Sequence, residues 1–131
     1  MGDLCQNLSR REMACACGCG FDTVDIELVG VIQATCYHFA DQMGAKVTLI
    51  VTGPNRCPAH NAETPGASKG SFHQFARAMD FKLFVDGNQI PPMAVYTYLC
   101  GAYPGKYGVG LYSNRVHLDT RSNGPARWEN N

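Results

Sequence analysis

The chain has 131 residues, of which 45% are hydrophobic and 17% are charged, and its 11 lysines and arginines balance its 11 acidic residues. A chain of this length can bury an ordinary core, and the composition is typical of a globular domain, which excludes a disordered chain or a membrane protein. The balanced charge gives no reason to expect a nucleic acid as a partner. We therefore expect a single globular domain over residues 1–131.

The first 22 residues are rich in cysteine and glycine and show no signal for export. They lack the apolar run of a secretory signal peptide, and no apolar stretch of 18 residues occurs anywhere in the sequence. Gln6 stands where an acylation signal needs Ser or Thr. The sequence therefore predicts synthesis in the cytoplasm without a signal peptide, and no membrane partner.

Three of the seven cysteines stand in the run CACGCG, as Cys15, Cys17 and Cys19. One interpretation is a second, structural metal bound by this run and a distant thiol such as Cys57, although the paired C-x-x-C spacing of a zinc ribbon is absent. We favour the other interpretation, a reduced loop loosened by glycine and holding no metal. A disulfide framework suits a cytoplasmic start even less.

A long helix and a strand follow this segment. The helix is predicted for residues 23–43, because apolar residues recur there at steps of three and four. Asp22 or Thr23 can cap its start, and Gly44 can end it. The segment KVTLIV, residues 46–51, is predicted as the first strand.

A second strand is predicted in the middle of the chain. A loop rich in glycine, proline, alanine and serine leads to Ser71, and the strand AMDFKLFV then spans residues 78–85. Its alternation places apolar residues on one face and Asp80 on the other, where the acid needs a partner. Asp86 and Gly87 form a tight-turn signal, which a short return strand follows.

The last third of the chain is predicted to contain one helix and two strands. Pro92 introduces the helix of residues 93–103. The segments YGVGLY and RVHLD, residues 107–112 and 115–119, are predicted as strands, and a polar tail begins at Thr120. No repeat or linker divides the chain, so we predict an α+β domain with helices packed on a small, mainly antiparallel sheet.

Two histidines are accompanied by acids at a spacing that suits a metal site. His73, Asp80 and His117 together offer two imidazole nitrogens and one carboxylate, a ligand set that suits catalytic zinc and leaves a position open for water. Asp119 lies two residues after His117, on the same face of a strand. It could be a general base or a residue that orients the ligand. The alternative is that both histidines hydrogen-bond locally and that the acids form salt bridges.

Three motifs occur in a fixed order from about residue 46 to residue 128. They stand in VTGPNRCPAHN, SFHQFARAMDF and YGVGLYSNRVHLDTRSNGPARW. They resemble, in turn, Ser-Gly-x-Arg-x-x-x-x-Asn, Ser-x-His-x-x-Gly-x-Ala-x-Asp and the closing His-x-Asp and Arg-Trp segment of the zinc D-alanyl-D-alanine carboxypeptidases. This peptidase M15 type family of peptidoglycan peptidases includes phage endolysins and murein endopeptidases. Thr52 stands where the motif has serine and Ala76 where it has glycine, and neither is a ligand.

The resemblance implies a fold like that of DD-peptidases and hedgehog-type signalling domains, with zinc at the open face of the sheet. Carried over by position, His73, Asp80 and His117 become the zinc ligands. Some relatives carry the base three residues before the last histidine, where this chain has Asn114. Because an amide cannot act as a base, the resemblance favours Asp119 as the general base.

The resemblance also implies contacts with a substrate. Arg56 becomes the cation that polarises the scissile carbonyl and stabilises the oxyanion, for which a guanidinium is suited. Ser71 would help to position the zinc site. The residues expected to bind substrate are Ser71, Arg56, Asn61 and Trp128.

The implied function is that of a monomeric, zinc-dependent peptidase that cuts peptidoglycan stem peptides. It would act as a D-Ala-D-Ala carboxypeptidase or as an endolysin-type endopeptidase. It would reach the cell wall after holin-type release or as part of a phage particle. The alternative is a non-catalytic, zinc-containing domain of the same fold that binds wall peptide without cutting it.

Overall fold

The computed structural model describes residues 2–65, 67 and 70–130, so residues 66, 68 and 69 of the loop expected before Ser71 lie outside the described part. The described residues form helices on a sheet, which confirms the predicted α+β class. The helices are α1 (Arg10–Met13), α2 (Ile26–Met43), α3 (Pro58–Glu63), the 3-10 helix η1 (Phe72–Phe75) and α4 (Pro92–Ala102). The strands are β1 (Thr48–Gly53), β2 (Ala78–Val85), β3 (Asn88–Gln89), β4 (Gly108–Tyr112), β5 (Val116–Asp119) and β6 (Ala126–Asn130).

Within the described residues, six strands form one sheet in the order β1-β2-β5-β4-β6, and β3 pairs with β2. Every pair is antiparallel except β4 with β6, which run parallel. The prediction of a mainly antiparallel sheet is therefore confirmed. The tail from Thr120, which the sequence described only as polar, contains an edge strand that was not predicted, β6. Its residues are half-buried or exposed and show no apolar pattern.

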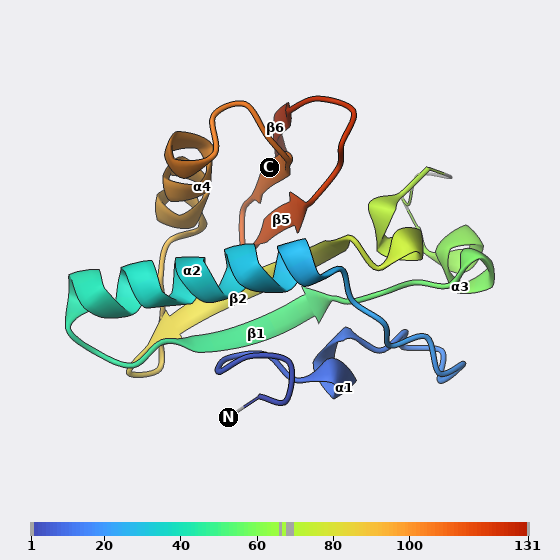
Figure 1. Ribbon diagram of the computed structural model, residues 1–131, viewed down its shortest axis with the longest axis horizontal. Coiled ribbons are helices and arrows are strands. Elements are labelled where there is room, and N and C mark those ends of the chain that lie inside the picture. The colour runs from blue at the N-terminus through green and yellow to red at the C-terminus, as the bar shows by residue number, and fades with distance from the viewer. Residues whose placement is uncertain (1, 66, 68–69, 131) are drawn as a thin grey trace.

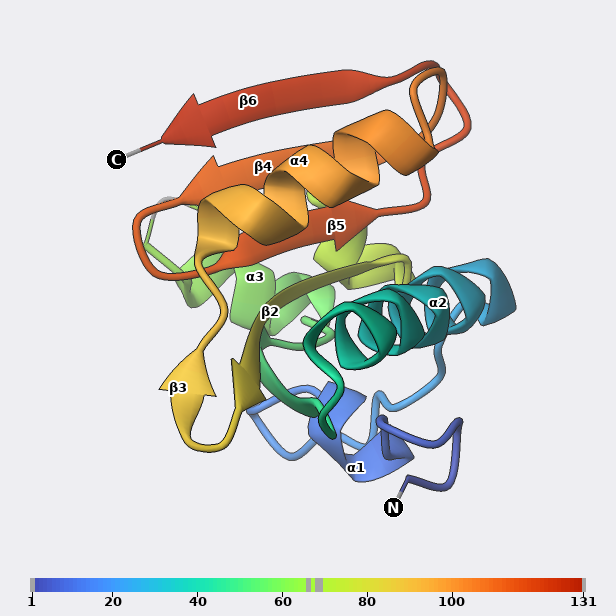
Figure 2. The same ribbon diagram turned by 90° about the vertical axis from the view of Figure 1, so that its left-hand side faces the viewer.

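The core lies between the sheet and the helices (Figures 1 and 2). Leu28 and Ile32 of α2 and Leu99 of α4 belong to the same buried cluster as Phe81 of β2 and Leu118 of β5. In Figure 1, α1 and the N-terminal segment lie below β1, on the other side from α2. No helix in the described part of the chain has the length and apolarity needed to cross a membrane.

The N-terminal segment is part of this core, although it contains little regular structure. Leu8 and Met13 are fully buried in the same cluster as the side chains of α2 and the sheet. The backbone N–H of Asn55 donates to the carbonyl of Met13, which ties the segment to the chain after β1. The cysteine-rich residues that follow Met13 are therefore held against the body of the domain.

Several predicted boundaries differ from the structure. Helix α2 begins at Ile26, three residues later than predicted, because Asp25 is still extended and its carboxylate accepts a hydrogen bond from Thr120. Its end at Gly44, in the left-handed conformation with a φ of 62°, is as predicted. Strand β1 begins two residues later than predicted and continues to Gly53. The short helices α1, α3 and η1 lie in regions that the sequence predicted as loops.

One row of residues crosses the sheet on the face opposite the core. Gly53 of β1 pairs with Asp80 of β2, which pairs with His117 of β5. His117 in turn pairs with Gly110 of β4, which pairs with Trp128 of β6. A Cβ atom at Gly53 would lie 2.4 Å from a carboxylate oxygen of Asp80, and one at Gly110 would lie 2.4 Å from the ring of Trp128. The two glycines therefore make room for the large side chains between and beside them.

Replacing Gly110 with alanine should destabilise the fold and move Trp128. We expect a loss of about 1–3 kcal/mol, because the added methyl group meets the indole ring in a packed site. Denaturant unfolding measures the loss. Since Trp128 is the only tryptophan in the chain, its fluorescence reports the displacement of the ring directly.

Gly30→Ala is the matched control. Gly30 is exposed within α2, and a Cβ atom built there meets nothing within 4 Å. This substitution should stabilise the protein by up to about 1 kcal/mol through helix propensity and leave the fluorescence unchanged. Equal stability of the Gly110→Ala variant and the unmodified protein would show that the indole does not depend on this glycine.

Candidate metal centre

The three side chains expected to bind zinc meet on the face of the sheet opposite the core. The donor atoms of His73, Asp80 and His117 all lie within 4.8 Å of one another. Oδ1 of Asp80 lies 2.9 Å from Nδ1 of His117 and 3.6 Å from Nε2 of His73. Both histidines are buried and Asp80 is half-buried. The structure thus brings the expected ligand set together at one point.

The 3-10 helix η1 orients His73. Ser71 caps this helix, since its Oγ accepts a hydrogen bond from the backbone N–H of His73 at 3.2 Å. The ring nitrogen Nδ1 of His73 lies 2.9 Å from the carbonyl oxygen of Pro54, so it carries the proton and donates it. Nε2 is then left with a lone pair that faces Asp80, as a metal ligand requires.

The helix η1 ends at Ala76, where the related motif has glycine. Ala76 has a φ of 59° and lies in the left-handed region. Glycine adopts this conformation at a lower cost than alanine, which gives a physical reason for the glycine of the motif. The backbone N–H of Asp25 donates to the carbonyl of Ala76, so the turn is also tied to the start of α2.

His117 lies between two carboxylates. Its Nδ1 is 2.9 Å from Oδ1 of Asp80, and its Nε2 is 2.8 Å from Oδ2 of Asp119. Burial opposes a charge on the ring, but the hydrogen bonds to Asp119 and Asp80 outweigh it and raise the pKa of His117. Nδ1 of His117 is therefore the nitrogen that faces the other two candidate ligands.

Asp119 is fully buried and its carboxylate is saturated with donors. Oδ1 accepts from the backbone N–H groups of Gly108 and Arg121 and from Nε of Arg121, at 3.1, 3.2 and 2.7 Å. Oδ2 accepts from a terminal nitrogen of Arg121 at 2.7 Å and from His117. Burial alone would raise the pKa of Asp119, but these hydrogen bonds hold it well below its ordinary value.

A carboxylate in that setting is a weak base and has little freedom to accept a proton from water. It is well placed to fix the ring of His117, as carboxylates that accept from a metal-bound histidine commonly do. Of the two roles that the sequence left open for Asp119, the geometry therefore favours orientation of the ligand. Arg121 completes the arrangement by binding Asp119. Sequence reasoning missed this arginine, although His117, Asp119 and Arg121 follow one another at intervals of two residues.

The ligands line a cleft with a volume of about 390 Å³. Arg56 reaches it from the segment after β1, where its terminal nitrogen donates to Oγ of Ser71 at 3.0 Å. Trp128 also lines the cleft, and its ring centroid lies 5.0 Å from that of His117. Sequence reasoning missed Tyr112 and Arg115, which line the same cleft.

Asn61 is placed differently from the other expected substrate contacts. It is buried within α3, and the residues that line the cleft do not include it. Its backbone N–H donates to the carbonyl of Cys57 within the helix. A direct contact between Asn61 and a substrate therefore stays a prediction.

The donor set fits zinc. Two imidazole nitrogens and one carboxylate oxygen are ligands that zinc accepts in catalytic sites, where a fourth position is open to water. Each histidine has its second nitrogen engaged elsewhere, by Pro54 for His73 and by Asp119 for His117. Asp80 keeps its charge for this purpose, because the two histidines hold its pKa below the ordinary value against the effect of burial.

The comparisons with known proteins identify one family. A family model described as Peptidase M15 matches residues 6–119. This range includes Arg56, the three candidate ligands and Asp119, as well as most of the cysteine-rich N-terminal segment. No curated protein and no solved structure matches the chain.

Replacing Asp119 with asparagine should lower the affinity for zinc by about 10- to 100-fold, the range for the loss of a partner that orients a histidine ligand. The amide keeps the shape of the carboxylate but no longer balances the charges of His117 and Arg121. Titration of the metal-free protein with zinc against a chelator of known affinity measures the change.

Asp86→Asn is the control. Asp86 is an exposed carboxylate in the turn between β2 and β3, so this substitution removes the same charge far from the cleft. Its zinc affinity should equal that of the unmodified protein. An unchanged affinity in the Asp119→Asn variant, with folding intact by circular dichroism, would refute the orienting role and return Asp119 to the role of general base.

Proposed function

This chain belongs to the peptidase M15 family, and we propose that it is a zinc-dependent peptidase that hydrolyses peptide bonds in the stem peptides of bacterial peptidoglycan. Membership in the family implies a metallopeptidase, and peptidases of this family are in general zinc-dependent. The observation that carries the proposal is the convergence of His73, Asp80 and His117 in a cleft that Arg56 also lines.

The protein side chains would hold the metal and fix its surroundings. Nε2 of His73, Nδ1 of His117 and the carboxylate of Asp80 are the atoms that face one another. When bound there, zinc would polarise a substrate carbonyl and lower the pKa of a bound water toward ~7. Asp119 would keep the ring of His117 in the tautomer that leaves Nδ1 free for the metal.

Arg56 would act on the scissile carbonyl. Its guanidinium is held by Ser71, and its backbone N–H donates to the carbonyl of His73 at 2.9 Å, so it is fixed relative to a ligand. Arg56 also lines the cleft, and a guanidinium fixed in this way suits the stabilisation of negative charge that develops on an oxyanion.

The remaining walls of the cleft support an acidic substrate. Arg56, Arg115 and Arg121 line it, and Arg115 stacks on the ring of Tyr112 at 4.0 Å. Stem peptides carry free carboxylates, which three guanidinium groups would attract and orient. Trp128 and Tyr112 offer flat apolar surfaces beside them, joined by a hydrogen bond of 3.1 Å.

The proposed site of action is the cell wall, reached from the cytoplasm by release through a lysis pore or as a component of a phage particle. The second candidate, a wall-binding domain without catalysis, uses the same cleft and ligands. Arg56 favours the peptidase, because its guanidinium is held beside the candidate ligands, where negative charge would develop on a scissile carbonyl. The two candidate functions differ in whether the protein releases new fragments from peptidoglycan.

Incubation of purified peptidoglycan with the protein should release new fragments that mass spectrometry can identify. The fragments should disappear with a chelator and return when zinc is restored, and their masses would name the bond that is cut. Binding to the wall without fragments, by a protein that carries zinc at His73, would favour the wall-binding domain instead.

Replacing Arg56 with lysine should reduce kcat by about 10²- to 10³-fold, the range for the loss of one donor to an oxyanion. A lysine keeps the charge but cannot reach Ser71 and the substrate with the same planar group. Steady-state kinetics on a peptidoglycan peptide that contains the cleaved bond would measure the change in kcat, with zinc content determined in parallel.

Arg11→Lys is the matched control, because Arg11 is exposed on α1 and does not line the cleft. It should leave kcat unchanged. Full activity of the Arg56→Lys variant at normal zinc content would remove Arg56 from the mechanism and reduce it to a structural cation.

A further inference from the structure

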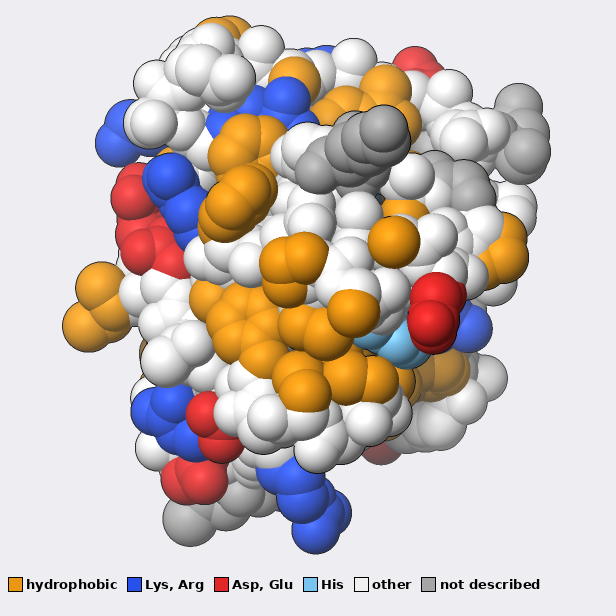
Figure 3. Space-filling view, turned by 90° about the vertical axis from the view of Figure 1, so that its right-hand side faces the viewer, with side chains coloured by type: hydrophobic (Ala, Val, Ile, Leu, Met, Phe, Trp, Pro, Cys, Tyr) orange, Lys and Arg blue, Asp and Glu red, His pale blue; other side chains and the backbone are white. Residues whose placement is uncertain are grey.

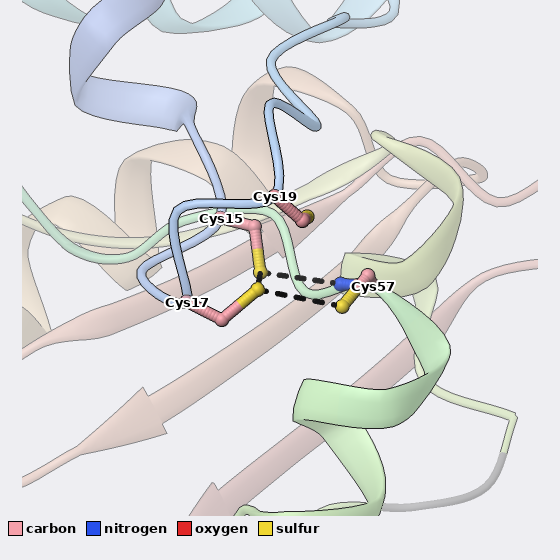
Figure 4. Close-up of side chains that lie close together, drawn as sticks. All are labelled: Cys15, Cys17, Cys19 and Cys57. Carbon is pink, nitrogen blue, oxygen red and sulfur yellow. Dashed lines mark hydrogen bonds between the residues drawn. The ribbon is translucent and has the colours of Figure 1, made fainter.

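Four cysteines that the proposed peptidase does not use meet at a second place. The sulfur atoms of Cys15, Cys17, Cys19 and Cys57 all lie within 4.8 Å of one another (Figure 4). The sulfur of Cys17 is 3.4 Å from that of Cys15 and 3.6 Å from that of Cys57. The thiol of Cys57 thus joins the CACGCG run from 40 residues further along the chain.

The run folds back on itself through a turn and two glycines. The backbone N–H of Gly18 donates to the carbonyl of Cys15, and the N–H of Cys15 donates to the carbonyl of Phe21. Gly18 and Gly20 have φ values of 80° and 89°, which glycine adopts readily and other residues rarely do. The alternation of cysteine with small residues therefore lets three thiols approach one point.

The remaining ligand comes from the segment that carries Arg56. Cys57 is the residue before α3, and its sulfur accepts from the backbone N–H of His60 at 3.4 Å. The backbone N–H of Cys57 donates to the sulfur of Cys15, also at 3.4 Å. Two sulfur atoms of the cluster therefore accept backbone hydrogen bonds, which stabilise the thiolate form that binds a metal.

The spacing of the sulfur atoms suits a tetrahedral metal. With a zinc–sulfur bond of about 2.3 Å, neighbouring sulfurs in a tetrahedral site lie about 3.8 Å apart. The observed sulfur–sulfur distances of 3.4 and 3.6 Å are close to this value, whereas a disulfide would bring two sulfurs to about 2 Å. All four thiols are free in this structure.

We propose that Cys15, Cys17, Cys19 and Cys57 bind a second, structural zinc ion as thiolates. Four thiolates form a closed tetrahedral set, which is typical of structural rather than catalytic zinc. Binding releases the thiol protons to solvent, since the ligands are deprotonated. The proposal does not depend on the peptidase activity, because the two sites share no ligand.

The exposure of the cluster gives a further reason for a metal. Cys17 and Cys19 are exposed, and free exposed thiols are open to oxidation. Figure 3 shows the side of the molecule where α3 lies, with hydrophobic side chains gathered near its centre. Ligation would protect the thiols and tie the N-terminal segment to the start of α3.

The proposal is tested by metal content and by cobalt spectroscopy on the full chain, purified under reducing conditions. The unmodified protein and the control Cys100→Ser, whose cysteine lies in α4 outside the cluster, should each carry two zinc ions per chain. Cys17→Ser should carry one. After replacement of zinc by Co²⁺, the unmodified protein should show thiolate-to-cobalt charge-transfer absorption.

The variant His73→Ala separates the two sites. It should lose the ion of the catalytic cleft and retain the thiolate-to-cobalt absorption, which Cys17→Ser should lose. The unmodified protein and His73→Ala both keep the four cysteines, so the thiolate-to-cobalt absorption can be tested in them. The test therefore holds even where Cys17→Ser fails to fold. Absence of the absorption in both, or an intact mass that shows a disulfide together with one zinc ion, would overturn the proposal.

Discussion

The pairing of β2 with β5 places Asp80 directly opposite His117, and the rest of the cleft depends on this register. A shift by one residue would turn Asp80 toward the core and separate it from both histidines, because neighbouring residues of a strand face opposite sides. The apolar residues of β2 on the core side, such as Phe81 and Leu83, oppose such a shift. The packing of the hydrophobic core thus also fixes the geometry of the metal ligands.

Around this pair, charges of opposite sign alternate in a chain from Asp80 through His117 and Asp119 to Arg121. Each buried charge has a partner of the opposite sign, which is the condition under which charges are tolerated away from water. The carboxylates of Asp80 and Asp119, on the two sides of His117, also favour positive charge at this point. A metal held by Nδ1 would leave the hydrogen bond between Nε2 and Asp119 in place, so the ring would keep its orientation.

The sequence predicted the elements that local pattern determines. The alternation in residues 78–85, the turn at Asp86 and Gly87, and the helix after Pro91 all correspond to the structure within about one residue. The bend at the turn follows from positive φ values of 51° and 79° at these two residues. Motif spacing found the candidate ligands, because Asp80 and His117 lie in strands whose pattern was readable and His73 stands seven residues before Asp80.

Features that depend on distant partners escaped the sequence. Strand β6 lies parallel to β4 with a register that joins Trp128 to Gly110, and nothing in the local pattern of residues 126–130 indicates this pairing. Asp25, the extended residue before α2, accepts a hydrogen bond from Thr120, which is 95 residues away. The role of Asp119 likewise depends in part on the backbone N–H of Gly108, which comes from the neighbouring strand β4.

The segment after β1 joins the two candidate metal sites through consecutive residues. The carbonyl of Pro54 holds the ring of His73, and Asn55 donates from its side chain to the carbonyl of Thr23. Arg56 is bound to Ser71, and Cys57 lies in the cysteine cluster. These residues belong to no helix or strand, so tertiary contacts alone fix the guanidinium relative to the ligands. A metal at the cysteine cluster would add a rigid anchor one residue from Arg56. The cysteine-rich N-terminal segment would then serve the peptidase site by fixing its cation rather than by touching the substrate.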